Sequence, residues 1–167
     1  MNFEELFKMG LDRDLPQLLE APEGISIGLG ESGSKRLGRD LCLGLPGWHW
    51  PVDPIPAADE TVAIIHAYHF FEHIPGEEAI QLLWECQRVL KVGGILQFCI
   101  PWAKAEIAFQ DLTHKSFWTE SSFKMLMNNP YYDPSTDERQ WRLRQHYLVL
   151  AGVVERNICL LGQLVKE

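Results

Sequence analysis

Two histidines and a glutamate lie close together at His69, Glu72 and His73, in the order His-x-x-Glu-His. On a helix this order brings two imidazoles to one zinc ion and a carboxylate to the metal-bound water, as in one class of metalloprotease. Here the residues follow a β-branched apolar run and precede Pro75, so they span a strand end and a loop. The sequence therefore favours a hydrogen-bonded His73 and predicts no metal, with a zinc hydrolase kept as a minor alternative.

A glycine turn follows the apolar run that begins at Ile25. Gly28, Leu29 and Gly30 are followed by Gly33, and glycines at such a turn adopt positive φ and let a ligand approach the backbone. The spacing also fits a dinucleotide-binding turn, although no long apolar helix follows Gly33 to direct its N-terminus at a pyrophosphate. A tight turn that binds nothing explains these residues equally well.

A polar loop, residues 110–118, contains Asp111 and His114 and follows the strand that ends at Pro101. Ligands of open α/β sheets bind beyond the carboxyl ends of the strands, where a histidine and an aspartate can move a proton. The alternative is a surface loop in which Asp111 only caps a turn.

The elements that must position these residues alternate between strands and helices, which is typical of a parallel sheet covered by helices. Strands are predicted at residues 25–30, 39–43, 62–68 and 95–100. A helix begins after Pro75 and ends at Gly93 and Gly94, and a shorter helix runs from Thr119 to about Met127. Residues 141–150 and 153–165 form an antiparallel pair that turns at Ala151 and Gly152.

Composition restricts the partners. The chain has 167 residues, 15 Lys and Arg against 23 Asp and Glu, and a net charge of −8, which disfavours nucleic acid as a partner. It has neither a secretory signal nor the run of about 20 apolar residues that crosses a membrane, so we expect a cytoplasmic protein with no membrane partner. The four cysteines form no Cys-x-x-Cys pair and are expected to be buried thiols.

Together these segments resemble the class I S-adenosylmethionine-dependent methyltransferases, in particular a small branch of them. The resemblance covers Ile25 to about Leu126 and is strongest from Val62 to Pro101. Three segments carry it in the order and spacing of the branch: Glu72-His73-Ile74, then residues 85–96 with Arg-Val-Leu-Lys-x-Gly-Gly, then Ile100-Pro101. Residues 111–123, with Asp-x-Thr-His-Lys, resemble a further motif.

The resemblance implies an α/β fold, a Rossmann-like and mostly parallel sheet with helices on both faces, ending in the antiparallel pair. It also implies one methyltransferase-like domain, 1–167, with a short helical cover (1–24), a cofactor-binding core (25–127) and the strand pair (128–167). S-adenosylmethionine would be the cofactor. The residues implied to bind it are Gly28, Leu29, Gly30, Asp40 at the ribose, Trp50 at the adenine, and Ala67 and Tyr68 beside the sulfonium.

The catalytic candidates are His114 first and His69 second, as bases for an acceptor that must lose a proton. The acceptor, a small molecule or an unknown partner, is not predicted, and Trp118 and Trp141 are candidate exposed residues at which two copies would form a homodimer. Ser26 stands where the branch has an acid, and Leu29 where it has a small residue. These departures leave open a catalytically inactive binding or assembly module.

Overall fold

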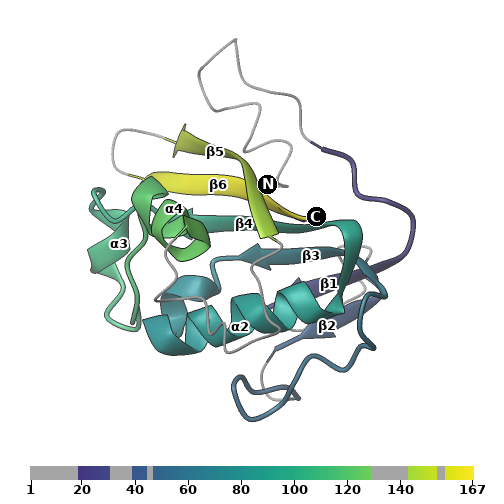
Figure 1. Cartoon of the computed structure of the whole chain (residues 1–167). Helices are drawn as coiled ribbons and strands as arrows, with labels where there is room; N and C mark the ends of the chain where they lie inside the picture. Colours follow the sequence, from purple (N-terminus) through teal and green to yellow (C-terminus); the bar gives the residue numbers. More distant parts are fainter. Residues whose placement is uncertain (1–18, 31–38, 45–46, 129–142, 154–156) are drawn as a thin grey trace.

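A six-stranded sheet organises the chain. The computed structural model describes residues 19–30, 39–44, 47–128, 143–153 and 157–167. The strand order is β2-β1-β3-β4-β6-β5, and the strands are β1 (Ile25–Leu29), β2 (Leu41–Leu43), β3 (Val62–Tyr68), β4 (Leu90–Pro101), β5 (Leu143–Val153) and β6 (Asn157–Lys166) (Figure 1). The first four are parallel, whereas β6 runs antiparallel to both β4 and β5. The predicted α/β fold is confirmed.

The strand-helix-strand unit predicted at the centre is present as β3, a 3-10 turn η2 (Phe71–His73), α2 (Gly76–Val89) and β4. Glu77 and Glu78 lie in the first turn of α2, where negative charge is favourable. One apolar face of α2, which includes Leu82 and Leu83, is buried against the sheet. This is the pattern that apolar residues at helical spacing predict.

The predicted end of this helix at Gly93 and Gly94 is wrong. The helix ends at Val89, and Leu90 is already extended, with φ −66° and ψ 133°. Leu90 pairs with Val62 across the sheet, and the register then shifts before Ile64 pairs with Ile95. The neighbouring strand therefore offers hydrogen bonds that end the helix four residues before the glycines.

Aromatic rings fill the core between the sheet and α4 (Glu120–Asn128). Phe98 of β4 stacks on Phe123 at 4.5 Å, and Trp118 stacks on Phe123 at 5.1 Å. Helices α2 and α4 thus cover the face of the sheet that carries Phe98 (Figure 1). Trp118 is only 5% exposed, so its expected exposure at a dimer contact is wrong, and Trp141 lies outside the described residues.

The C-terminal strand pair is confirmed, but its turn is not where we predicted it. Ala151 and Gly152 lie inside β5 and pair with Cys159 and Ile158 of β6. A glycine in a strand can continue a ladder, so Gly152 was a weak turn signal. Of the predicted helical cover at residues 1–24, only residues 19–24 are described, and they contain no helix. Within the described residues, none of the helices has the length and apolarity to cross a membrane.

Candidate functional site

The connections between the strands define where a ligand is expected to bind. The chain leaves β1 for β2 on one side and then returns to β3 on the other side, so the order reverses between β1 and β3. In open α/β sheets such a switch point opens a crevice beyond the carboxyl ends of the two strands. Here these ends are Gly30, directly after β1, and His69, directly after β3. The fold therefore brings two of the predicted site residues to one edge.

Gly30 has the backbone that the predicted turn requires. Its φ is +76°, and its N–H donates to the carbonyl of Leu43 at 2.7 Å, which ties the turn to the end of β2. A Cβ on Gly30 would lie 2.7 Å from Cδ2 of Phe70. Gly30 therefore allows both a left-handed backbone and close contact with the Phe70 ring, which in turn lies 6.1 Å from the ring of Trp48.

Asp40 lies at the opposite edge of the sheet. It precedes β2, and its carboxylate accepts the backbone N–H of Ser26, near the start of β1, at 2.7 Å. Because parallel strands begin at the same edge, the structure does not bring Asp40 to Gly30. In the loop after β2, the carboxylate of Asp53 accepts the N–H of His49 at 2.8 Å.

Most of the other predicted cofactor residues lie on or near the edge of the sheet that carries Gly30. Gly28 pairs with His66 and Leu29 pairs with Ala67, but the Leu29 and Ala67 side chains are fully buried in the core. Only their backbone can face a ligand. Trp50 is partly buried, stacks on Trp48 at 6.3 Å and donates its indole N–H to the carbonyl of Glu78 in α2.

A chain of polar side chains crosses the sheet face opposite to Phe98, and sequence reasoning missed it. Gln163 donates to Gln97 at 2.9 Å, and Gln97 donates to the Tyr68 hydroxyl at 2.8 Å. That hydroxyl lies 3.0 Å from Nδ1 of His66, to which it can donate if the imidazole is neutral. Burial, with Arg39 nearby, lowers the pKa of His66 to about 3. The available signal was the alternation of apolar and polar side chains in residues 65–68.

Replacing His66 with glutamine should make the protein more resistant to acid. The folded pKa of about 3 lies below the ordinary 6.5, so the unfolded chain takes up a proton first as the pH falls. The contribution of neutral His66 to the unfolding free energy is therefore fully present above pH 6.5 and is lost as the pH falls towards 3. Between about pH 7 and pH 5 the wild type should lose about 2 kcal/mol of unfolding free energy that His66→Gln retains.

Urea denaturation at the two pH values measures this difference. His49→Gln, at an exposed histidine, is the control and should follow the wild type. Equal losses in His66→Gln and in the wild type would contradict the assigned neutral state.

Glu72 is buried, 1% exposed, and links the predicted histidines. Its Oε1 accepts from Nδ1 of His69 at 3.0 Å, whereas its Oε2 has no hydrogen-bond partner among the described residues. One ligand atom each of Glu72, His73 and His114 lie within 4.8 Å of one another. The imidazole of His114 is 6% exposed and donates from Nδ1 to the carbonyl of Ala108. His69 and His114 thus flank the same carboxylate.

The His-x-x-Glu-His motif does not bring its two histidines to one point. His69 instead groups with Cys99 and Cys159, with one ligand atom of each within 4.8 Å of the others. Hydrogen bonds that His69 donates to Cys159 and then to Glu72 raise the pKa of His69, and a hydrogen bond from the Cys99 thiol lowers the pKa of Cys159. The site therefore favours a thiolate beside an imidazolium.

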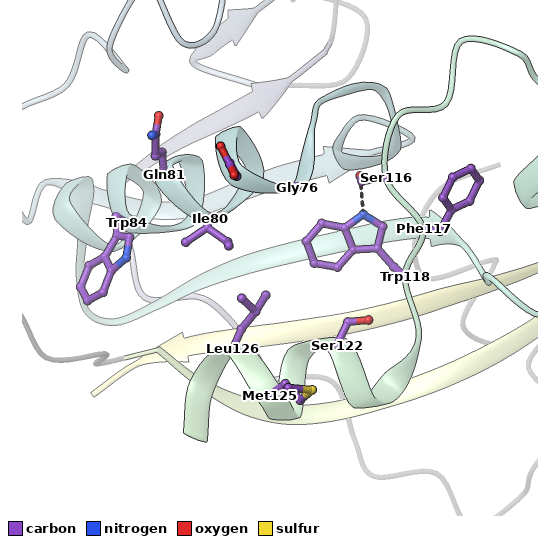
Figure 2. A pocket seen from close by; sticks show the side chains of 11 residues that line it. Gly76, Ile80, Gln81, Trp84, Ser116, Phe117, Trp118, Ser122, Met125 and Leu126 are labelled. Atoms are coloured by element: carbon purple, nitrogen blue, oxygen red, sulfur yellow. Dashed lines mark hydrogen bonds between the residues drawn. The ribbon is translucent and has the colours of Figure 1, made fainter. Parts of the chain in front are cut away.

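A groove lies elsewhere, between α2 and α4. This groove has a volume of about 880 Å³, and Figure 2 shows Ile80 and Trp84 of α2 facing Met125 and Leu126 of α4 across it. Trp118 forms part of its wall and donates its indole N–H to Oγ of Ser116 at 2.8 Å. The groove is thus lined by the loop that follows His114 and is separate from the Gly30 edge.

Comparison with known proteins identifies the central unit. Residues 49–98 match a family described as a methyltransferase domain. This span covers β3, α2 and most of β4 and does not include the glycine turn. No curated protein matches the chain.

Solved structures match over most of the chain. A SAM-dependent methyltransferase from Archaeoglobus fulgidus is 14% identical, with 86% of each chain covered and a TM-score of 0.59. One from Aquifex aeolicus is 16% identical, with 99% of this chain and 90% of that chain covered and a TM-score of 0.59. The N-methyltransferase NodS from Bradyrhizobium japonicum is 11% identical, with 98% and 93% covered and a TM-score of 0.56. At these identities the likeness shows the fold.

Proposed function

We propose that this chain, which has the fold of the class I SAM-dependent methyltransferases, binds S-adenosylmethionine at the Gly30 edge and transfers its methyl group to an acceptor. The observation that carries the proposal is the left-handed Gly30 at the switch point between β1 and β3. A side chain there would collide with Phe70, so the turn can follow this path only with glycine.

The cofactor supplies an electrophilic methyl group on a sulfonium, which a nucleophilic atom of the acceptor attacks in line. The chain has to hold the two reactants in line and exclude water. Gly28 and Gly30 provide a backbone without side chains, and Trp48, Trp50 and Phe70 provide apolar rings beside it. For an acceptor that must lose a proton, His114, beside Glu72, is the proposed base. His69, the second candidate from the sequence, has its pKa raised to about 10 and is therefore protonated at neutral pH, so it does not serve as a base.

One set of observations favours the second candidate, a methyltransferase-shaped binding module without turnover. Asp40, proposed for the ribose, is engaged with Ser26 at the far edge, and the Phe70 ring lies on Gly30 where a ligand would approach. A module of this kind would keep the fold and bind a partner instead of the cofactor. Cofactor binding separates the two functions.

Calorimetry with S-adenosylmethionine and with its demethylated product tests the proposal. An enzyme should bind both, because the two ligands share the adenosyl and amino acid parts. Heat that saturates with about one ligand per chain supports the methyltransferase. Absence of binding at millimolar concentrations of both ligands would overturn it and favour the module.

A further inference from the structure

We propose that His69, Cys99 and Cys159 form a zinc-binding site at the edge where β3 and β4 end. Nothing in the sequence pattern assigns this site, because its three members lie 30 and 60 residues apart along the chain. It is a property of the sheet, and it stands whether or not the chain transfers methyl groups. It replaces the sequence-based expectation that the cysteines are inert buried thiols and that no metal binds.

The distances suit a metal with sulfur and nitrogen ligands. Nε2 of His69 lies 3.7 Å from Sγ of Cys99, and the three ligand atoms are all within 4.8 Å of one another. Zinc bonds of about 2.3 Å to sulfur and about 2.1 Å to nitrogen at tetrahedral angles separate such ligands by about 3.6 to 3.8 Å. The His69–Cys99 distance already matches this separation, and the 4.8 Å limit on all three atoms leaves each of them near it.

The sheet itself places the two cysteines. Cys99 pairs with Leu161 and Pro101 pairs with Cys159 across the antiparallel β4 and β6, so the cysteines are diagonal neighbours. Residues two apart on a strand share a face, which puts both thiols on one side of the sheet. Cys99 is 1% exposed, so its sulfur is held in a fixed environment.

His69 reaches these thiols through an unusual backbone. It has φ +51°, a left-handed conformation that residues other than glycine rarely adopt, and its N–H donates to the carbonyl of Cys99 at 2.8 Å. Strained conformations of this kind persist where the surrounding structure imposes them, often at functional sites. The strain on His69 turns its imidazole towards β4.

Glu72 prepares His69 as a ligand. Its Oε1 accepts from Nδ1 of His69 at 3.0 Å, which fixes the proton on Nδ1 and leaves Nε2 for the metal. A carboxylate behind a metal-bound histidine is a common second partner in zinc sites. Glu72 is therefore a positioning residue, and its burial keeps the carboxylate in place.

Three protein ligands leave one coordination position for water or a ligand atom. The His69 side chain is 49% exposed, so this position is accessible from solvent. Zinc uptake displaces the thiol proton of Cys99 and the proton between His69 and Cys159, which gives the bound site two thiolates and a neutral imidazole. With zinc bound, His69 is a ligand, and His114 stays the candidate base.

Metal content and cobalt substitution test the site in the reduced protein. After addition of zinc and gel filtration, we expect about one zinc ion per chain. Cobalt in its place should show an intense near-ultraviolet band from thiolate-to-cobalt charge transfer. A cobalt spectrum without this band would overturn the proposal, and this result needs no variant.

Single substitutions locate the ion. Cys99→Ser and Cys159→Ser should each lose stoichiometric zinc, and Glu72→Gln should bind it about 10- to 100-fold more weakly. Cys42→Ser, at a cysteine in β2, is the matched control and should keep the ion. His114→Ala tests the other donor group, formed by Glu72, His73 and His114, and should also keep it.

Two outcomes contradict the assignment. Zinc that is lost in His114→Ala but kept in both cysteine variants would place the ion at the other donor group. Full zinc in Cys159→Ser, the variant at the less buried of the two cysteines, would show that its sulfur is not a ligand. Far-ultraviolet circular dichroism of each variant separates loss of the site from loss of the fold.

Discussion

Replacing Gly162 with alanine is expected to destabilise the protein by about 3 kcal/mol. Gly162 pairs with Phe98 across β6 and β4, and a Cβ there would lie 2.9 Å and 3.0 Å from two ring carbons of Phe98. The ring cannot move aside, because it is fully buried and stacks on Phe123 at 4.5 Å. The alanine must therefore displace β6 or break the aromatic stack.

Urea denaturation of Gly162→Ala beside Gly76→Ala measures this effect. A Cβ at Gly76, the first residue of α2, would meet no atom within 4 Å, so this variant should be close to wild type. Adding Phe98→Leu to Gly162→Ala should recover part of the loss, because a smaller side chain makes room for the methyl group. Equal stability of the two glycine variants would show that Phe98 does not pack on Gly162 as described.

The central unit could be predicted because its signals are local. β3 is rich in β-branched residues, and α2 has apolar residues at helical spacing behind an acidic first turn. Each element is specified by its own residues, so no knowledge of its neighbours was needed. The same holds for the alternating residues of β5 and for the apolar run of β6.

The sequence predictions were wrong where contacts with residues distant in sequence determine the local structure. The strand pairing of Leu90 with Val62 ended α2 before its glycines, and the pairing of Gly152 with Ile158 continued β5 past the predicted turn. Trp118 was expected to be exposed, but the rings of Phe71 and Phe123 cover it. Such contacts join residues far apart in sequence, and local patterns do not contain them.

In the candidate site, too, local patterns found some residues, and others depend on contacts between distant parts of the chain. The glycine turn and His69 were found from their position after strands, and the structure places both at the switch point. Asp40 was assigned by resemblance alone and lies at the other edge. The grouping of Cys99, Cys159 and His69 depends on the register of β4 against β6, which no spacing along the chain reveals.

Replacing Gly30 with alanine should weaken binding of the demethylated cofactor product at least about tenfold, which corresponds to about 1.4 kcal/mol. Two physical effects combine. The φ of +76° is unfavourable for any residue with a Cβ, and that Cβ would lie 2.7 Å from the Phe70 ring. The turn must therefore change its path, and its backbone leaves the position that the ligand is proposed to contact.

The contact between Gly30 and the Phe70 ring allows a more specific test of this prediction. In Gly30→Ala the methyl group and the ring compete for one space, whereas in the double variant with Phe70→Ala only the backbone strain is left. Calorimetry should thus show partial recovery of affinity in the double variant and wild-type affinity in Gly76→Ala, where a methyl group is unobstructed. Unchanged affinity in Gly30→Ala would place the cofactor away from this turn, because a ligand that contacts the backbone of residue 30 cannot ignore a displacement of that backbone.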